Sequence, residues 1–566
     1  MIPKLFKNII YSIILPLIML AVGFIVVFMI MLSGGFDPVV AYLPSSYTPS
    51  EYNTMKELLG FNDPLIFQFF RFVIQMFNPI WWGNTIMVPG MPATEIVIPS
   101  ISESLSFTVL PIILGTGLGL LFGLLSTKLK DKILKLLFHI AIVLLISVPA
   151  IYLAFWNQLI LGAAFDLFPT TGDPILPSMV LFYITTALMA IFFRSNFIER
   201  RQKHYLPSNA LKFCLIINVI FTTSIILELI FNIHGLGRTL FEAIMAQDYY
   251  VLRAILVLML FLSIVPQIFV NLGFTFYSFI TEDFEPEPLM KLVESKDSLS
   301  AEIIRSDNNF GSNLKEAFIM RLKSPLTILG LIIVGFVVLV AIFPTILTPF
   351  SYEQANDVGM GSWDPPSPEH PLGQTHLGRD VLARLVYGIR TTLVIGIISS
   401  LIGLLGGLIL GFVAQLHRFV KAVILAGVTF GFLLPTFVIV IALMSGQAID
   451  ALVMTIFIGI FLIPAFTLVF CKTEYKLREL IVTCITYLPL IMIFTVLFIE
   501  TLSFVGFSDL MLIHLGADIS TGRSYLFVAY WASLYPALTL NILGIGFFSL
   551  YYGLREPIVI NFRRRK

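Results

Sequence analysis

Long apolar runs divide this chain, and they constrain its fold more than any other feature. A helix needs roughly 20 apolar residues to cross a membrane. Runs of about that length fall near 9–32, 101–125, 133–155, 175–193, 210–232 and 254–280, and again near 325–349, 390–415, 420–445, 451–471, 480–503 and 526–553. Since 58% of the 566 residues are hydrophobic and 12% are charged, no soluble core accounts for the apolar surface. The sequence predicts an all-α integral membrane protein with about 6+6 transmembrane helices.

The two sets of predicted spans follow the same plan. Residues 209–280 place Glu228 in an apolar stretch, followed by a glycine-containing loop and a second apolar stretch, and residues 480–552 repeat this order around Glu500. A duplicated membrane unit indicates two lobes with a pathway between them, as in transporters built from parallel repeats. We therefore expect Glu228 to superpose on Glu500 after a rotation about the membrane normal.

Positive charge gathers in alternate loops, which predicts the orientation of the chain. The basic segments contain Lys4 and Lys7; Lys128, Lys130, Lys132 and Lys135; Arg194, Arg200, Arg201 and Lys203; His417, Arg418 and Lys421; Lys472, Lys476 and Arg478; and the tail Arg563-Arg564-Arg565-Lys566. Lysine and arginine mark cytoplasmic loops, so both termini are predicted to be cytoplasmic and both halves to share one orientation. The net charge of +1 gives no indication of a nucleic-acid partner.

Residues 33–100 form the largest segment on the predicted outer side. A short amphipathic helix is expected there, with Ser50 as its N-cap before Glu51. An aromatic cluster with Trp81 and Trp82 follows, and such side chains suit the interface between membrane and water. We interpret the cluster as a membrane anchor; contact with a substrate is the other interpretation.

Glu228 and Glu500 are the strongest intramembrane candidates for a special role. A charge in apolar surroundings is costly and is usually paired or functional. Both residues lie near a predicted outer helix end, so we expect them to accept hydrogen bonds from loop N–H groups, with substrate contact as the alternative. His370 and His376 are interpreted as structural. The sequence shows no clustered titratable groups within the spans, which argues against an enzyme, and no catalytic, cofactor-binding or metal-ligating residue is predicted.

Three segments carry a resemblance to a known family. Two lie in the first half, Leu59-Gly60-Phe61-Asn62-Asp63-Pro64-Leu65 and the loop His234-Gly235-Leu236-Gly237-Arg238. The third is His370-Pro371-Leu372-Gly373-Gln374-Thr375-His376-Leu377-Gly378-Arg379-Asp380, which continues to Gly388. On these residues the chain resembles the permease subunits of the dipeptide/oligopeptide/nickel ABC importer family. The first half is similar to the B-type permease, and the second half is similar to the C-type permease.

The resemblance implies a type I ABC importer permease fold made of two halves. Residues 1–280 would be the B-type half and 324–566 the C-type half. The charged cytoplasmic segment 281–323 would link two formerly separate subunits; an ordinary interhelical loop is the alternative. The implied function is the permease component of a peptide-importer system in the plasma membrane of a prokaryote. The implied partners are membrane lipid, two ABC ATPases and an extracytoplasmic substrate-binding protein. ATP would bind to the ATPases, and this chain has no G-x-x-x-x-G-K-[ST] loop.

Outer-loop residues of both halves are candidates for an outer gate and for docking of the binding protein. Glycine permits positive φ and tight turns, and Asp380 near a helix start is favoured by the helix dipole, while Arg379 is expected to pair locally with it or with a neighbouring carboxylate. The candidates are Gly235, Gly237, Arg238, Gly373, Gly378, Arg379 and Asp380. Loop architecture alone is the other interpretation.

The chain departs from the family in its cytoplasmic loops. Permeases of this family carry a coupling helix in each half, with a Glu-Ala-Ala-type motif followed by glycine, and loops 194–209 and 472–479 lack it. The residual coupling candidates are Arg200, Arg201, Lys476 and Arg478. The loss predicts that ATPase association is weak or uses other surfaces, such as 281–303 or the tail. It also raises an alternative function, a transport-inactive membrane scaffold within a larger complex with other membrane subunits.

Overall fold

The computed structural model describes residues 2–33, 36–44, 46–129, 150–201, 207–280, 321–433, 436–444, 450–471 and 477–555, together with positions 134, 137 and 141. In these residues the protein is all-α, as predicted. Nine of the described helices are long and apolar enough to cross a membrane, or ten if the bent pair around residue 233 counts as one span. The total of twelve stays a prediction, because 133–155 and 420–445 lie partly outside the described residues.

The helices of the first half begin at the N-terminus and end before the linker. They are α1 (Ile2–Ser33), η1 (Val40–Tyr42), α2 (Pro49–Leu58), α3 (Leu65–Met76), η2 (Pro79–Trp81), α4 (Ala93–Lys128), α6 (Ala150–Asn157), η3 (Gln158–Ala164), α7 (Ile175–Arg201), α8 (Pro207–Phe231), α9 (Leu236–Met245) and α10 (Tyr249–Ile280).

The second half has a closely similar order of long and short helices. They are α14 (Pro325–Ile342), η4 (Pro344–Ile346), α15 (Tyr352–Asn356), α16 (Val381–Leu416), α17 (Arg418–Leu433), α18 (Thr436–Met444), α19 (Ala451–Phe470), α20 (Leu477–Val505), α21 (Leu515–Arg523), α22 (Leu526–Ala529) and α23 (Trp531–Arg555).

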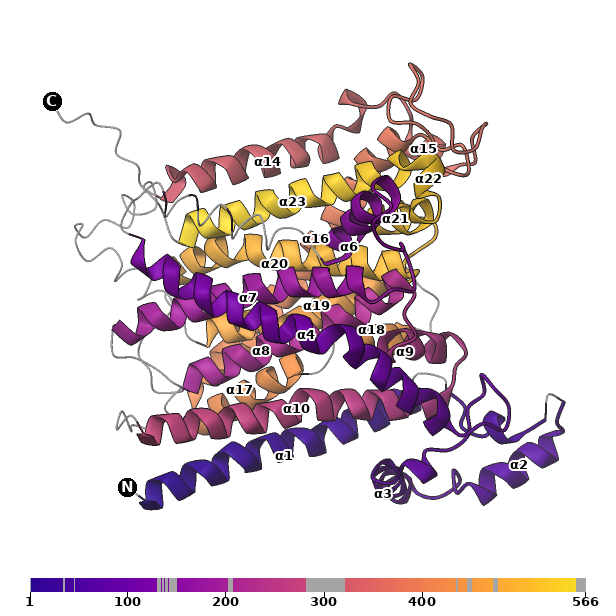
Figure 1. The fold of residues 1–566 in the computed structure, drawn as a ribbon, viewed down its shortest axis with the longest axis vertical. Coiled ribbons are helices and arrows are strands. Elements are labelled where there is room, and N and C mark those ends of the chain that lie inside the picture. The colour runs from indigo at the N-terminus through magenta and orange to yellow at the C-terminus, as the bar shows by residue number, and fades with distance from the viewer. Residues whose placement is uncertain are drawn as a thin grey trace.

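The two halves pair their helices in the same way. In the first half α1 packs on α10 and α4 on α7, and in the second half α14 packs on α23 and α16 on α19. Figure 1 shows the α1–α10 and α14–α23 pairs at opposite edges of the molecule, with the other long helices between them. The start of α1 and the end of α23 lie on the same side, as an even number of spans requires.

Small residues allow the closest helix pairs to form. A Cβ added to Gly119 of α4 would overlap Met189 of α7, and one added to Gly407 of α16 would overlap Phe466 of α19. Without a hydrophobic driving force between helices in lipid, such close backbone approach is a main source of packing energy. The same device therefore holds the corresponding pair in each half.

The core is shared by the two halves. Helix α17 of the second half packs against α8 and α10 of the first, α18 packs against α1, and α6 of the first half packs against α23. Each of the two largest clusters of buried apolar side chains contains residues from both halves. The halves are therefore joined along their length and do not form separate bodies.

Helix α2 of the outer segment has a different N-cap residue from the one predicted. The N-cap of α2 is Thr48, whose hydroxyl accepts from the N–H of Glu51 while the Glu51 carboxylate accepts from the N–H of Thr48. The prediction of Ser50 was wrong because Pro49, with its fixed φ, already takes the first helical position. Asp248, at the start of α10, accepts hydrogen bonds from the Thr85 hydroxyl and other outer groups and so fixes the segment to the membrane helices.

Candidate functional site

In the first half, a buried carboxylate lies near the end of the membrane helix that precedes the glycine-containing loop. Glu228 of α8 is 1% exposed. Its carboxylate accepts from the Ser104 hydroxyl at 2.6 Å and from the N–H groups of Gly237 at 2.5 Å and Arg238 at 3.3 Å. The Ser104 hydroxyl oxygen accepts in turn from the N–H of Leu236 at 2.8 Å. These acceptors satisfy the first N–H groups of α9, which no intrahelical carbonyl reaches.

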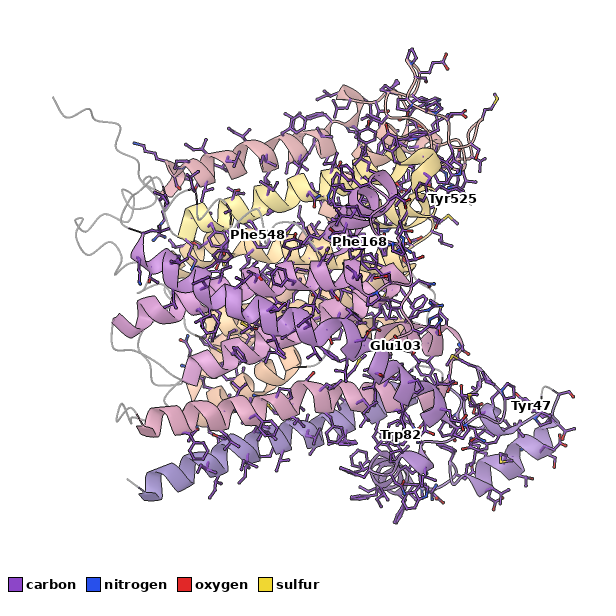
Figure 2. The ribbon with its side chains drawn as sticks, viewed as in Figure 1. Tyr47, Trp82, Glu103, Phe168, Tyr525 and Phe548 are labelled. Atoms are coloured by element: carbon purple, nitrogen blue, oxygen red, sulfur yellow. The ribbon has the colours of Figure 1, made fainter. Side chains whose placement is uncertain are left out.

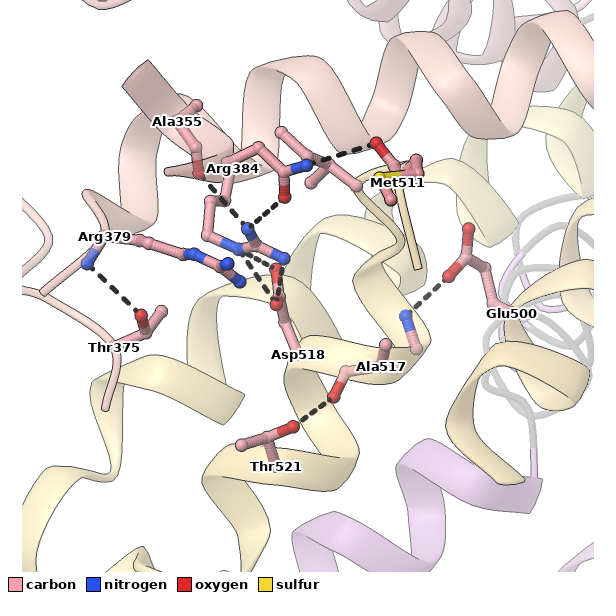
Figure 3. A network of polar contacts seen from close by, with 12 residues as sticks. Ala355, Thr375, Arg379, Arg384, Glu500, Met511, Ala517, Asp518 and Thr521 are labelled. Atoms are coloured by element: carbon pink, nitrogen blue, oxygen red, sulfur yellow. Dashed lines mark hydrogen bonds and ion pairs between the residues drawn. The ribbon is translucent and has the colours of Figure 1, made fainter. Parts of the chain in front are cut away.

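The second half contains the same arrangement. Glu500 of α20 is fully buried. It accepts from the Thr392 hydroxyl of α16 and from the N–H of Gly516, the latter at 2.5 Å and near the start of α21. Figure 3 shows the Glu500 carboxylate directed at this helix start. In the first half a carboxylate on α8 thus joins a hydroxyl of α4 to the start of the short outer helix α9. In the second half a carboxylate on α20 joins a hydroxyl of α16 to the start of the short outer helix α21.

These contacts hold each short helix in a folded-back position. The apolar end of α8 and helix α9 form a pair bent by 70°. Such a bend leaves backbone N–H groups without helical partners, and unsatisfied groups are costly inside a membrane. A carboxylate supplies strong, charge-assisted acceptors for them. The geometry is that of a structural role for Glu228 and Glu500, and the full superposition of the halves stays a prediction.

Glycine is needed at these loop positions for two different physical reasons. Gly373 and Gly378 have φ angles of 78° and 68°, the left-handed region that favours glycine. Gly235 has a φ angle of −88° and Gly237 lies within α9, so the expectation of positive φ was wrong for this pair. They are needed for space, because a Cβ at Gly235 would overlap the buried carboxylate of α8 and one at Gly237 would overlap the α8 backbone. Asn232 supplies the left-handed turn, with a φ angle of 60°.

Asp380 begins α16 with a side-chain cap, as its position suggested. One carboxylate oxygen accepts from the N–H of Ala383 at 2.6 Å, and the other lies 2.9 Å from Nδ1 of His370. Arg379 does not pair with Asp380, one of its two expected partners, because His370 lies against that carboxylate. The Nε–H of Arg379 has no partner in the described part of the chain. Its side chain lines a small cleft with a volume of about 10 Å³.

A buried ion pair fixes α21 to α16. Arg384 lies 2.7 Å from the Asp518 carboxylate, and the two side chains are 7% and 11% exposed. Arg384 also donates to the carbonyl of Ala355. Figure 3 shows the guanidinium between α15 and α21. On the first half, by contrast, Arg238 pairs with Glu242 along the surface of α9 itself.

The two halves meet at their outer ends through these short helices. Arg523 at the end of α21 donates a hydrogen bond to the carbonyl of Ile230 in α8 and stands over the ring of Phe504 at 5.3 Å. Burial lowers the pKa of Arg523 to about 10, so it is charged at neutral pH. Phe241 of α9 packs edge-to-face on Phe507, with ring centroids 6.2 Å apart. The outer ends of the halves are therefore closed against each other.

Sequence reasoning missed these contacts between the halves. The available signal was Arg523 itself, a cation in the short segment between two predicted spans. His514 was also missed: it is the N-cap residue of α21, it is 1% exposed, and burial lowers the pKa of its ring to about 4. Neither of its ring nitrogens has a partner in the part of the chain that the structure describes.

The coupling candidates lie at the opposite ends of the spans. Arg200 and Arg201 are the last residues of α7, and Arg478 is in the first turn of α20; the positions of their side chains, and the whole of Lys476, lie outside the described residues. Pro207 is the first residue of α8, and residues 202–206 between α7 and α8 lie outside the described residues. Most of the linker and the basic tail are likewise outside the described residues.

Comparison with known proteins places the chain among membrane permeases. Residues 312–366 match the family model for the N-terminal TM domain of oligopeptide transport permease C. The dipeptide transport system permease protein DppB of Lactococcus lactis is 28% identical over 235 residues, which are 37% of this chain and 77% of that protein. The corresponding protein DppC of Alkalihalophilus pseudofirmus is 27% identical over 271 residues, 43% of this chain and 88% of that protein.

The chain is similar to permeases of dipeptide and oligopeptide ABC importers. A third relative is the metal-staphylopine import system permease protein CntB of Staphylococcus aureus, 25% identical over 268 residues, 40% of this chain and 83% of that protein. Each permease is matched over most of its own length but over less than half of this chain. A chain of 566 residues made of fused B-type and C-type halves fits these matches.

Proposed function

We propose that this chain is the permease component of a peptide-importer-type ABC system and that its substrate passes between the two halves. The observation that carries the proposal is the repeated carboxylate arrangement, which holds one short helix of each half where the halves meet. The named relatives are permease proteins of dipeptide transport systems and of a metal-staphylopine import system, and we take a peptide as the substrate class. The scaffold alternative is not favoured, because these relatives are transport permeases.

The sidedness of the molecule suggests where the partners bind. Helices α2, α9, α15 and α21 cluster at one end of the spans, and the start of α1 lies at the other (Figure 1). The first end offers a surface to an extracytoplasmic binding protein. The second end, with the basic residues, faces the cytoplasm and two ATPases, which would carry out the ATP hydrolysis. The chain itself provides the path and the moving parts.

Transport then requires the outer contacts between the halves to open. The Arg523 contact with Ile230 and the Phe241–Phe507 ring contact close this end. Rocking of one repeat against the other would separate them while leaving each half intact. A covalent link across the contact should therefore stop transport.

The test uses the full chain in vesicles with the ATPases and binding protein encoded beside it. Uptake of labelled dipeptides and oligopeptides is measured with and without ATP. Phe241→Cys and Phe507→Cys are introduced together, with the native cysteines replaced by serine, and linked by a short reducible cross-linker. We expect ATP-dependent uptake that is lost on cross-linking and returns on reduction.

The control is Phe241→Cys alone, treated with the same reagent, which should retain uptake. Uptake that continues in fully cross-linked protein would contradict a path that opens between these helices. Absence of uptake for every peptide tested, with assembled partners present, would contradict the function itself.

A further inference from the structure

A pocket lies under α3 at the outer ends of α1 and α10. It has a cavity volume of about 60 Å³, and its lining is mainly aromatic apart from two arginines and two glutamines. The arginines are Arg71 of α3 and Arg253 of α10. Trp82, labelled in Figure 2, marks this corner of the molecule. The proposed transport path lies elsewhere, because the halves meet around α9 and α21.

Arg253 carries a buried charge that lacks a carboxylate partner. Its side chain is 2% exposed, and it forms no ion pair with any described carboxylate. Its terminal nitrogens donate to the Gln75 side chain at 3.0 Å and to the carbonyls of Trp81 and Trp82 at 3.3 and 3.0 Å. The guanidinium also stands over two tyrosine rings, 5.4 and 4.7 Å from their centroids. Its Nε–H has no partner in the described part of the chain.

The pocket as a whole is positive. Arg71 is held by Asp63 at 2.5 Å and donates to the carbonyl of Leu59 at 2.8 Å. Asp248 begins the same helix as Arg253, but its carboxylate is occupied by the outer segment and by N–H groups of its own first turn. Arginine cannot be deprotonated in proteins. One positive charge, mostly withdrawn from water, is therefore left without a negative partner.

The pocket borders a surface suited to lipid. Helix α3 exposes a continuous apolar face, and Arg71 is its only charged residue. The exposed apolar residues of α3 are Leu65, Ile66, Phe67, Phe70 and Ile74, with exposed fractions between 56% and 62%. Figure 1 shows α3 nearly end-on, while the membrane helices run across the view. A helix with this composition and direction lies in the plane of the membrane interface.

We propose that this pocket binds the phosphate of an anionic phospholipid of the outer leaflet. The unpartnered Nε–H of Arg253 would donate a charge-assisted hydrogen bond to one phosphate oxygen, and an aromatic, weakly hydrated setting strengthens such a contact. The acyl chains would lie on the exposed face of α1, which includes Ile25, Met29 and Leu32. Because α1 forms one edge of the molecule (Figure 1), a lipid reaches this site from the bilayer without entering the transport path.

The test measures lipid binding to the purified full chain by native mass spectrometry. Three probes are titrated: phosphatidylglycerol, diacylglycerol with the same acyl chains, and glycerol 3-phosphate. The first has phosphate and chains, the second lacks phosphate, and the third lacks chains. We expect phosphatidylglycerol to bind more tightly than either of the others.

Three variants are compared with the natural chain. Arg253→Gln is expected to weaken phosphatidylglycerol binding about tenfold or more, the usual loss for one charged hydrogen bond. The side chain of Arg71 is 40% exposed, so Arg71→Gln should fold. This variant is expected to weaken phosphatidylglycerol binding about threefold, because Asp63 already pairs with that arginine. Lys56→Gln removes the same charge from α2, outside the pocket, and should change nothing.

Each outcome decides the proposal. If Arg253→Gln does not fold, Arg71→Gln against Lys56→Gln supplies the comparison. The site would be overturned if Arg71→Gln, and Arg253→Gln where it folds, bound phosphatidylglycerol as tightly as the natural chain does. Equal binding of diacylglycerol would overturn the role of the phosphate. Glycerol 3-phosphate bound as tightly as the lipid would assign the pocket to a free anion and overturn the lipid as its source.

Discussion

Replacing Glu228 by glutamine is expected to loosen the start of α9 while leaving the membrane helices in place. The substitution keeps the size of the side chain and one oxygen, but it removes the charge that strengthens three hydrogen bonds. Those bonds come from the Ser104 hydroxyl and from the N–H groups of Gly237 and Arg238. An NH₂ group in place of one oxygen also faces at least one of these donors.

The size of the effect follows from these contacts. A hydrogen bond to a charged group contributes about 1.5–3 kcal/mol, and a buried donor left unpaired costs about 1–3 kcal/mol. The bonds from Ser104 and Gly237 are short, and the bond from Arg238 at 3.3 Å is weak. We therefore expect local opening of the α9 start to become easier by about 2–3 kcal/mol, which is roughly a 30-fold to 150-fold change in the opening equilibrium.

Amide hydrogen exchange of the purified chain measures this opening directly. Exchange of the N–H groups of Leu236 and Gly237 should accelerate by that factor in Glu228→Gln, while amides in the middle of α4 and α7 should not change. Glu242→Gln is the matched control, because this carboxylate lies on α9 itself and pairs with Arg238 at its exposed side. Exposed pairs contribute about 0–1 kcal/mol, so its effect should be less than about fivefold.

Equal acceleration in Glu228→Gln and Glu242→Gln would refute the reasoning, since it would mean that the buried carboxylate holds α9 no better than a surface one. Acceleration along all of α4 and α7 in Glu228→Gln would also refute it, because the effect would then be global and the bonds to α9 would not explain it.

Three further predictions concern α21 and its surroundings. Asp518→Asn leaves Arg384 buried without its partner and should lower stability by about 3–5 kcal/mol, read as a fall in melting temperature in detergent. Gly516→Ala places a Cβ on the α20 backbone and should reduce the yield of folded protein, whereas Gly335→Ala meets no atom within 4 Å and should not. Burial lowers the pKa of His514 from 6.5 to about 4. The free energy of unfolding, which is complete above pH 6.5, should therefore fall by up to about 3 kcal/mol towards pH 4, because the unfolded state binds the proton more readily. His514→Gln should flatten this dependence of the melting temperature on pH.

The membrane helices were predictable because their signal is local. An apolar run of spanning length has few other folds available, and the runs near 175–193, 325–349 and 451–471 correspond to α7, α14 and α19. Boundaries were less accurate: α4 and α16 begin well before the predicted spans, at Ala93 and Val381. Their first turns are amphipathic and lie outside the apolar window, so hydropathy alone does not reveal them.

The buried carboxylates were predictable only in part. A glutamate near a helix end, followed by glycines, indicates bonds to loop N–H groups. Its hydroxyl partners were not predictable, because Ser104 precedes Glu228 by 124 positions and Thr392 precedes Glu500 by 108. Only tertiary packing brings these residues together. The contact of His370 with Asp380 was also missed, because it depends on how the loop between them folds over 10 positions.

The distribution of strong contacts suggests which parts of the molecule move together. The arginine–carboxylate pairs among the described side chains each join residues of one half: Arg71 with Asp63, Arg238 with Glu242 and Arg384 with Asp518. The hydrogen bond between His370 and Asp380 also stays within one half. The carboxylate contacts to α9 and α21 also stay within one half. At the outer meeting point the halves form an arginine-to-carbonyl hydrogen bond and a contact between two aromatic rings, and α22 packs against η3.

These two kinds of contact differ in what it costs to break them. Breaking a buried ion pair strands a charge and costs about 3–5 kcal/mol, whereas an aromatic pair contributes about 0.5–1.5 kcal/mol beyond its buried area. Separation of the outer ends of the halves therefore breaks weaker polar contacts than release of α21 from α16 does. Under the proposed function, opening would carry each short helix along with its own half, with the contact between the halves as the gate.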